Sequence, residues 1–362
     1  MKLGILGLTN SGKTTLFNAL TKSTANAANY PFSTVETSIG IVEVPDGRLE
    51  KLAAIYKSKK ITPAAIEFMD IAGLIRGSGK GEGLGNQFLA NIREADALVH
   101  VVRAFNDPNV MHVDGSVNPI RDIETVNYEL IFSDLDLLER RIIKTEKAAK
   151  ADKAMRKELD LLHIIKSKLE GGIPAREIVF ENNEDVVFAA SLNLLTYKPV
   201  LYALNVSEED AADSGSNFPE VLAFAKKERS EIFTVCAKME EELLPLSEED
   251  QLMFLNDLGI VENSLSKLIS ASYRLLGLIS FLTANQKETR AWTIKKGTKA
   301  LQAAGKIHSD IERGFIRAEI VNCEELFSLG SYSKARDGGF TRLEGKDYEI
   351  KESDVVLFRF NI

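Results

Sequence analysis

Residues 1–20, MKLGILGLTNSGKTTLFNAL, constrain the fold of this chain more than any other stretch. Residues 2–6 are a short apolar run that predicts a buried strand, and residues 7–14 fit the pattern G-x-x-x-x-G-K-[ST]. In this pattern the glycines turn successive backbone N–H groups toward phosphate oxygens, and the following helix adds the positive end of its dipole. The stretch therefore predicts a strand, a phosphate-binding loop and a helix that starts near Lys13.

The side chains of this loop have separate predicted roles. Lys13 supplies a positive charge to the phosphates and is a candidate catalytic residue, and the Thr14 hydroxyl is a candidate ligand for Mg²⁺. The other candidate nucleotide-binding residues in the loop are Asn10, Ser11, Gly12 and Thr15. A chance glycine-rich turn is the alternative, but three further motifs downstream favour the nucleotide interpretation.

Two downstream segments predict the rest of a magnesium and γ-phosphate site. Thr34, in the segment YPFST, is the candidate second hydroxyl ligand of Mg²⁺, and Thr37 is the competing candidate. Residues 66–73, IEFMDIAG, predict a strand that ends in D-x-x-G. The Asp70 carboxylate would then reach the Mg²⁺ shell through water, and the Gly73 N–H would meet the γ-phosphate.

The residue that would position the attacking water differs from the Ras-like pattern. Leu74 follows D-x-x-G where that pattern has a glutamine. His112, in the loop NVMHVDG, is the candidate replacement, and we expect it to approach the γ-phosphate or its water when the glycine-rich loop at residues 77–85 closes. We discount His100 because an imidazole inside an apolar strand is more often a core residue.

The segment that would recognise the base departs from the guanine-specific pattern N-K-x-D. After Asn205, the chain has Val206 where a lysine would cover the base and Glu208 where an aspartate would accept the N–H groups of guanine. This departure favours ATP, or little preference, over GTP. A weaker motif follows the next predicted strand at Cys236 and Ala237, where a backbone N–H usually touches the base.

The composition is typical of a globular protein with two or three domains, at 44% hydrophobic and 27% charged residues. No run of about 18 apolar residues is present, so we expect no membrane span. The first strand leaves no room for a secretory signal, so a cytoplasmic location is expected. Cys236 and Cys323 are far apart and are interpreted as reduced thiols. A net charge of −8 argues against a surface that coats nucleic acid generally.

A helical insertion is predicted at residues 121–197. Its apolar residues recur at helical spacing, which indicates two long helices in an antiparallel hairpin. At the tip, residues 139–157 carry eight Lys or Arg against three Asp or Glu, a net charge of +5. Two interpretations of this tip stay open: a contact with RNA or a ribosome, and a solvated helix face.

The C-terminal residues 278–362 predict short β segments and one helix, which fits a small α+β domain. Candidate members of a recognition surface there are Arg290, Trp292, Lys306, Arg313 and Arg317, although Trp292 on a strand is more often a core residue. The predicted division is a nucleotide-binding domain at residues 1–120 and 198–277, the insertion at 121–197 and the C-terminal domain at 278–362.

Taken together, these motifs resemble the Obg-like ATPases, the YchF proteins, over the whole chain. The most specific are the stretch GKGEGLGNQFL and the C-terminal run from ETRAWTI onward. The resemblance implies an α/β P-loop domain of the Obg type, a coiled-coil insertion and a C-terminal TGS (β-grasp-like) domain. It also implies ATP favoured over GTP, a catalytic histidine matching His112 and association with the ribosome. Asn10 matches the phosphate-loop asparagine through which some wider kin bind K⁺, so K⁺ is a further candidate cation beside Mg²⁺.

The interpretation that follows is a Mg²⁺-dependent ATPase that acts as a translation- or stress-related regulatory switch. Its expected partners are ATP and the ribosome, either the large subunit or the 70S-type particle. RNA contacts are expected through the hairpin tip and the TGS domain. Two alternatives stay open. One is a GTP-specific regulatory GTPase, and the other is a ribosome-binding regulator in which the nucleotide mainly sets the conformation.

Overall fold

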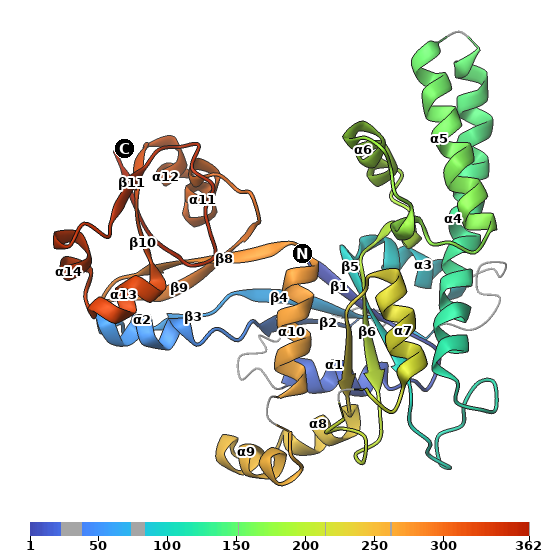
Figure 1. The fold of residues 1–362 in the computed structure, drawn as a ribbon, viewed down its shortest axis with the longest axis horizontal. Coiled ribbons are helices and arrows are strands. Elements are labelled where there is room, and N and C mark those ends of the chain that lie inside the picture. The colour runs from blue at the N-terminus through green and yellow to red at the C-terminus, as the bar shows by residue number, and fades with distance from the viewer. Residues whose placement is uncertain (23–37, 74–83, 151, 214, 261–262, 362) are drawn as a thin grey trace. The chain divides into compact units, whose positions relative to one another are not determined.

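The computed structural model describes residues 1–22, 38–73, 84–150, 152–213, 215–260 and 263–361. The chain divides into two compact units, Met1–Ile41 with Glu67–Leu268 and Val42–Ile66 with Ile269–Ile362. Figure 1 labels the helices and strands of both units. Among the described helices, none combines the length and the apolar character that crossing a bilayer requires.

A six-stranded sheet with the order β2-β4-β1-β5-β6-β7 forms the centre of the first unit. Its strands are β1 (Lys2–Leu6), β2 (Ser38–Glu43), β4 (Ala65–Asp70), β5 (Ala97–Arg103), β6 (Val200–Asn205) and β7 (Ile232–Val235). β1 pairs in parallel with β4 and β5, and β6 pairs in parallel with β5 and β7. The registers Ile5↔Asp70 and Arg103↔Asn205 therefore bring the carboxyl ends of these strands to one edge of the sheet.

The central strands of this sheet are apolar because helices cover them. Every residue of β5 and β6 is buried, as expected of parallel strands covered on both faces. The helices of the first unit are α1 (Lys13–Lys22), α3 (Leu84–Glu94), α4 (Pro119–Ala149), α5 (Lys153–Glu170), α6 (Asn183–Ser191), α7 (Pro219–Glu228), α8 (Ala237–Leu243) and α9 (Glu248–Asp257). Residues such as Ile92 of α3, Ile123 of α4 and Val221 of α7 pack with the strands in one core.

Helices α4 and α5 form the predicted hairpin (Figure 1). α4 begins after Asn118, whose side chain accepts a hydrogen bond from the Arg121 N–H, and Pro119 occupies its first turn. Leu138 and Leu162 belong to the core that the two helices share with the returning chain. Asp134, fully buried in α4, accepts hydrogen bonds from the backbone N–H groups of the 3₁₀ turn η3 (Leu195–Tyr197), which fixes the returning chain against α4.

The second unit has the α+β fold that the sequence predicts. Its sheet has the order β11-β10-β12-β8-β9-β3. The strands are β3 (Ile61–Thr62), β8 (Leu278–Ala284), β9 (Thr289–Lys295), β10 (Phe315–Asn322), β11 (Arg342–Glu344) and β12 (Asp354–Phe360), and the helices are α2 (Arg48–Tyr56), α11 (Ala300–Ile307), α12 (Ser309–Arg313), α13 (Cys323–Leu329) and α14 (Tyr332–Asp337). The division falls within α10 (Ser264–Leu275). Trp292 packs on the core of this unit and its indole N–H donates to Thr283.

The contact division differs from the sequence-based boundaries at residues 42–66. β3 pairs in parallel with β9 through the registers Ile61↔Thr289 and Thr62↔Arg290, and the Thr289 N–H donates to the Lys60 carbonyl. This segment therefore completes the sheet of the second unit, whereas the sequence-based division placed it within residues 1–120. Pairing between strands so distant in the chain leaves no local pattern from which to predict it.

Candidate nucleotide-binding site

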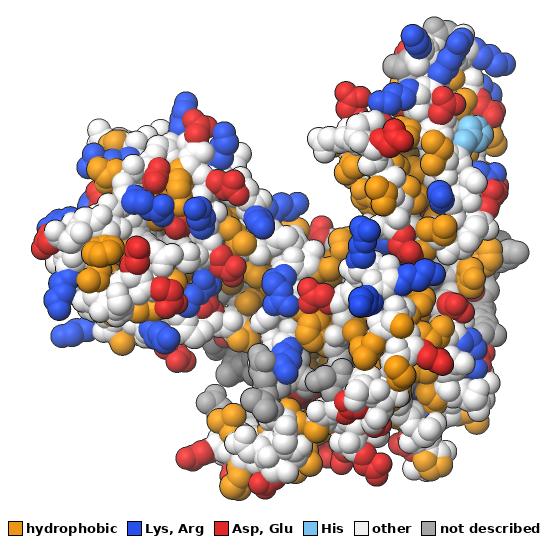
Figure 2. Space-filling view, in the orientation of Figure 1, with side chains coloured by type: hydrophobic (Ala, Val, Ile, Leu, Met, Phe, Trp, Pro, Cys, Tyr) orange, Lys and Arg blue, Asp and Glu red, His pale blue; other side chains and the backbone are white. Residues whose placement is uncertain are grey.

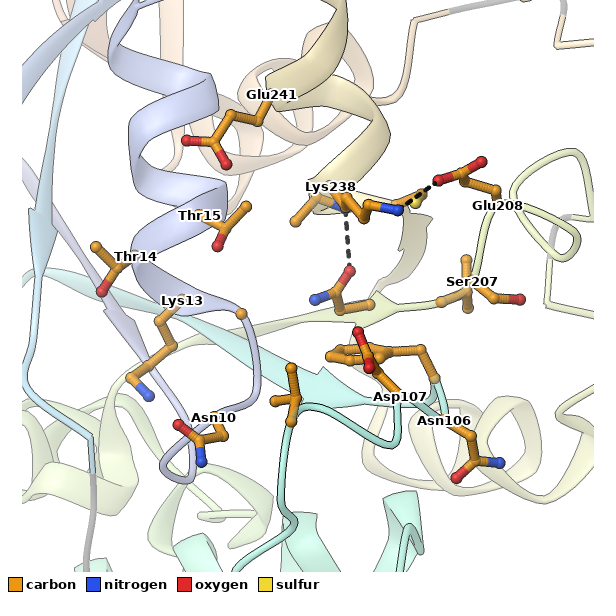
Figure 3. Close-up of a pocket in the computed structure, with 17 residues that line it drawn as sticks. Asn10, Lys13, Thr14, Thr15, Asn106, Asp107, Ser207, Glu208, Lys238 and Glu241 are labelled. Atoms are coloured by element: carbon orange, nitrogen blue, oxygen red, sulfur yellow. Dashed lines mark hydrogen bonds and ion pairs between the residues drawn. The ribbon is translucent and has the colours of Figure 1, made fainter.

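A pocket of about 510 Å³ lies where the carboxyl ends of β5 and β6 meet the start of α1. Figure 3 shows Asn10, Lys13 and Thr14 on one side of it and Ser207, Glu208 and Lys238 on the other. The lining residues that the sequence predicted are Asn10, Gly12, Lys13, Thr14, Thr15, Asn205, Val206, Glu208, Cys236 and Ala237. Segments far apart in the chain thus converge on one cavity.

The buried Lys13 ammonium is hydrogen-bonded to the backbone of the phosphate loop. Its Nζ donates a hydrogen bond of 2.7 Å to the Leu8 carbonyl. Burial lowers the pKa of Lys13 to about 8, although the nearby Asp70 carboxylate acts to raise it. Gly73 lies so close that a Cβ there would be 3.1 Å from Nζ. The D-x-x-G glycine therefore lies beside the phosphate-loop lysine.

Thr14 and Asp70 provide oxygen atoms suited to a hard divalent cation. The Thr14 hydroxyl lies 2.9 Å from Asp70 Oδ2, and Asp70 Oδ1 is buried with no hydrogen-bond partner among the described residues. Burial raises the pKa of Asp70, against the opposing effects of the Thr14 hydroxyl and the Lys13 charge. An unpaired buried carboxylate oxygen beside a hydroxyl fits Mg²⁺. The predicted second ligand Thr34 and its competitor Thr37 lie outside the described residues.

Asn205 joins the phosphate loop to the end of β7. Its Nδ2 donates to the Ser11 carbonyl and its Oδ1 accepts from the Ala237 N–H, both at 3.0 Å. Gly12, at φ 93°, passes so close that a Cβ would lie 2.2 Å from Asn205 Nδ2. The sequence predicted Asn205 as a nucleotide-binding residue and the backbone N–H at Ala237 as a contact to the base, and in the structure these two groups are hydrogen-bonded to each other.

The base end of the pocket carries an exposed ion pair. Lys238 Nζ lies 3.2 Å from Glu208 Oε1, as the dashed line in Figure 3 marks, and the Glu208 carboxylate raises the pKa of Lys238. Val206 is buried and Cys236 forms part of the wall beside it. Lys238 was not among the predicted site residues, because one lysine in an acidic helix gives no signal of its own.

The segment after β5 contributes a wall that sequence reasoning missed. Phe105, Asn106, Asp107 and Val110 line the pocket. Arg103 is buried next to these residues and donates a hydrogen bond of 2.7 Å to the Val110 carbonyl. Its guanidinium lies 4.4 Å from the centre of the Phe105 ring. The only available signal was an arginine at the end of the apolar strand ALVHVVR.

His112 does not line the pocket in this structure. Its imidazole is buried, with Nε2 2.8 Å from Asp122 Oδ2 and Nδ1 accepting the Asp114 N–H at 3.0 Å. The preceding residue, Met111, accepts a 3.0 Å hydrogen bond through its carbonyl from Asn10 Nδ2 of the phosphate loop. The loop that bears His112 thus touches the phosphate loop, while the imidazole is engaged elsewhere.

The remaining predictions concern His100 and the glycine-rich loop. His100 is a core residue: it packs 5.6 Å from the Tyr202 ring, and burial lowers its pKa to about 3. Leu74 and residues 77–83 of the predicted switch loop lie outside the described residues, and α3 begins at Leu84.

Comparisons with known proteins match both ends of the chain to families. Residues 2–135 match the MMR_HSR1 family, described as "50S ribosome-binding GTPase", and residues 278–361 match the YchF-GTPase_C family, described as "Protein of unknown function (DUF933)". A solved structure, that of the Schizosaccharomyces pombe YchF GTPase, is 35% identical and covers 99% of this chain and 97% of its own, with a TM-score of 0.88.

Curated relatives match over nearly their full length. The ribosome-binding ATPase YchF of Bacillus subtilis (strain 168) is 51% identical, with 99% of each chain covered. The protein of the same name from Haemophilus influenzae (strain ATCC 51907 / DSM 11121 / KW20 / Rd) is 46% identical, with 100% of this chain and 99% of the relative covered. The chain therefore belongs to the YchF family of Obg-like P-loop proteins.

Proposed function

We propose that this protein is a Mg²⁺-dependent NTPase that binds and hydrolyses ATP in preference to GTP and works as a ribosome-associated regulatory switch in the cytoplasm. The observation that carries the choice of base is at the base end of the pocket. There Asn205 is committed to the backbone of the phosphate loop and of Ala237, and Glu208 is paired with Lys238. The pattern N-K-x-D occurs nowhere in the sequence.

The phosphate end supports hydrolysis by electrostatic stabilisation. Lys13 and the loop N–H groups would neutralise the β- and γ-phosphates, and the Gly73 N–H would meet the γ-phosphate. Asn10, Ser11, Gly12 and Thr15 complete the loop around them. Water for the attack on the γ-phosphate would be positioned by His112, once its side chain leaves the orientation seen here.

Mg²⁺ would be held by Thr14 and, in the proposal, by Thr34, with Asp70 supporting it through water. The bound cation supplies charge stabilisation between the phosphates. K⁺ is a further proposed cation, and Asn10, the loop asparagine that would hold it, donates its Nδ2 to the Met111 carbonyl in this structure.

The base preference follows from which groups are free to pair. A guanine site presents a carboxylate to the N1–H and N2–H₂ donors of the base, but a Glu208 oxygen already accepts from an ammonium. Adenine has no N2 donor and loses nothing when that carboxylate is occupied. A site that has lost the pairing geometry for guanine also loses most of its power to select it.

Calorimetric titration with non-hydrolysable ATP and GTP analogues in Mg²⁺ tests this preference. We expect the ATP analogue to bind roughly tenfold tighter or more, since paired donors and acceptors in a base site discriminate strongly. The double variant V206K/E208D rebuilds N-K-x-D and should shift the ratio toward GTP. Tighter GTP binding by the unchanged protein would instead support the GTP-specific switch, which the words "GTPase" in the family description and in the name of the S. pombe relative favour.

Ribosome association rests on the relatives and on the charge of the hairpin. Both curated relatives carry the words "ribosome-binding" in their names. Figure 2 shows Lys and Arg side chains gathered at the end of the α4–α5 hairpin. Lys147, Lys150 and Lys153 there are exposed, and no ion pair involves them among the described residues. Ammonium groups without an ion-pair partner among the described residues can bind the phosphates of ribosomal RNA. The C-terminal domain is a second proposed RNA contact.

Reversal of the three tip charges, K147E/K150E/K153E, should weaken co-sedimentation with ribosomes by roughly tenfold at moderate salt and reduce the salt dependence of binding. The matched control is K226E/K227E/R229E, which reverses three exposed charges at the end of α7 and should leave binding nearly unchanged. Equal binding by both triple variants would assign the tip to a solvated helix face. A ribosome-binding regulator whose nucleotide mainly sets conformation would bind normally even when turnover is abolished.

A further inference from the structure

Both ring nitrogens of His112 are occupied in this structure. The Asp114 backbone N–H can only donate, so Nδ1 of the neutral imidazole is the unprotonated acceptor. Nε2 then carries the proton and donates it to Asp122 Oδ2 at 2.8 Å. An imidazole in this state has no free nitrogen with which to accept a proton from water or to orient it.

This arrangement differs from a catalytic His–Asp pair. In such a pair the carboxylate holds one ring nitrogen and the other faces the reacting atoms. Here the second nitrogen faces a backbone N–H two residues along the chain, and the residue is buried, at 7% exposure. The carboxylate of Asp122 therefore holds His112 in an unproductive orientation.

Arg121 fixes the carboxylate in turn. Its guanidinium lies 3.1 Å from Asp122 Oδ1 and 3.4 Å from Asp114 Oδ2, so one cation holds both acidic residues around the histidine. His112, Asp114 and Asp122 offer atoms close enough together for a metal ion. Because Arg121 already neutralises both carboxylates, the cluster is better explained as a set of hydrogen bonds that immobilises the imidazole.

The backbone before His112 is hydrogen-bonded to the phosphate loop and to the end of β5. Asn10 Nδ2 donates to the Met111 carbonyl, and Arg103 donates 2.7 Å to the Val110 carbonyl. Rotation of the His112 side chain, with its loop held in place, is thus a smaller change than movement of the whole loop. The pair of hydrogen bonds to the ring opposes that rotation.

We infer that Asp122, at the start of α4 and backed by Arg121, is a positioning residue that latches His112 away from the nucleotide and so limits the basal rate of hydrolysis. The inference rests on the proposed role of His112. It also identifies what must move: Asp122 lies in the first turn of α4, the helix that runs to the basic tip. A shift of this turn separates the carboxylate from the imidazole.

Steady-state ATP hydrolysis by the full chain tests the latch. In Asp122→Ala the charge-assisted hydrogen bond is gone, so we expect kcat to rise roughly tenfold while KM for ATP stays within about twofold. The gain must be absent in the double variant H112A/D122A, because it acts through the imidazole. Asp122→Asn, which keeps the size of the side chain but loses its charge, should give a smaller increase of about threefold.

A matched control lies on the same helix. Asp134 is also a buried carboxylate of α4 that accepts backbone N–H groups, but it holds η3 and touches no histidine. Asp134→Asn should lower the unfolding temperature without raising kcat. Nuclear magnetic resonance of ¹⁵N-histidine gives a second readout: the Nε2–H of His112, slow to exchange in the unchanged protein, should exchange rapidly in Asp122→Ala and at an intermediate rate in Asp122→Asn.

The outcomes separate the two hypotheses. A folded Asp122→Ala or Asp122→Asn protein that binds ATP normally but turns over at or below the original rate would overturn the latch and make Asp122 a support for His112. If His112→Ala alone hydrolyses ATP at the original rate, the catalytic assignment of His112 is wrong and the latch is overturned with it. A gain in kcat that survives in H112A/D122A would show that Asp122 acts by another route.

Discussion

Substitution of Lys13 by methionine is expected to lower kcat/KM for ATP hydrolysis by about 10²- to 10³-fold. Lys13 is buried, and its Nζ lies beside both the phosphate loop and the D-x-x-G glycine. Among the described residues that line the pocket, it is the one buried cation. A positive charge stabilises phosphate charge most strongly in a site with little water. Lys13 lies in such a site, since burial lowers its pKa to about 8. Removal of one such preorganised donor typically costs this much in rate.

The measurement is phosphate release under single-turnover conditions, paired with calorimetric titration of ADP and a non-hydrolysable ATP analogue. Methionine keeps an unbranched apolar stem close in size to that of lysine, so the fold should be retained. Lys22→Met is the control, since it removes the same charge from the exposed end of α1, outside the pocket. If Lys13→Met hydrolyses ATP as fast as Lys22→Met, the phosphates are not bound at this loop.

The elements that surround the site were predictable because their signals are local. The predicted strand at residues 2–6 is β1, the run ALVHVV at 97–102 is contained in β5 (Ala97–Arg103), and the helix predicted near Lys13 begins at that residue. Apolar runs of this length between polar turns specify buried strands without reference to the rest of the chain. The hairpin was equally local: α4 ends at Ala149 and α5 begins at Lys153, where the helical spacing is interrupted.

The functions of individual site residues were less predictable, because they depend on neighbours that the motif does not name. Asn205 was predicted to be a nucleotide-binding residue from its place before Val206 and Glu208, but its partner Ser11 is 194 positions away, and that contact turns the amide toward the phosphate loop. His112 was selected as the replacement for the missing glutamine, while its partner Asp122 occurs in an ordinary helix start and carries no signal in the sequence. Motifs identify which residue types converge, and tertiary contacts decide which of their atoms remain free.

Loss of the imidazole in His112→Ala is expected to lower kcat for ATP hydrolysis by about 10²-fold while the affinity for a non-hydrolysable ATP analogue changes by less than about twofold. The reason is that the histidine acts on the attacking water and does not line the pocket that binds the nucleotide. Turnover measured beside calorimetric affinity separates these two effects. His163→Ala, on the exposed surface of α5, removes an imidazole elsewhere and should leave both quantities unchanged.

His112→Gln distinguishes two ways in which the side chain can act on water. A glutamine amide can orient a water molecule by hydrogen bonding but cannot take its proton near neutral pH. If orientation is what His112 contributes, His112→Gln should recover a large part of the rate lost in His112→Ala, as expected for a loose transition state that depends mainly on positioning and charge. Equal losses in the two variants would assign a proton transfer to the imidazole. Rates equal to the unchanged protein in both would remove His112 from the mechanism and return the search to the residues that follow Gly73.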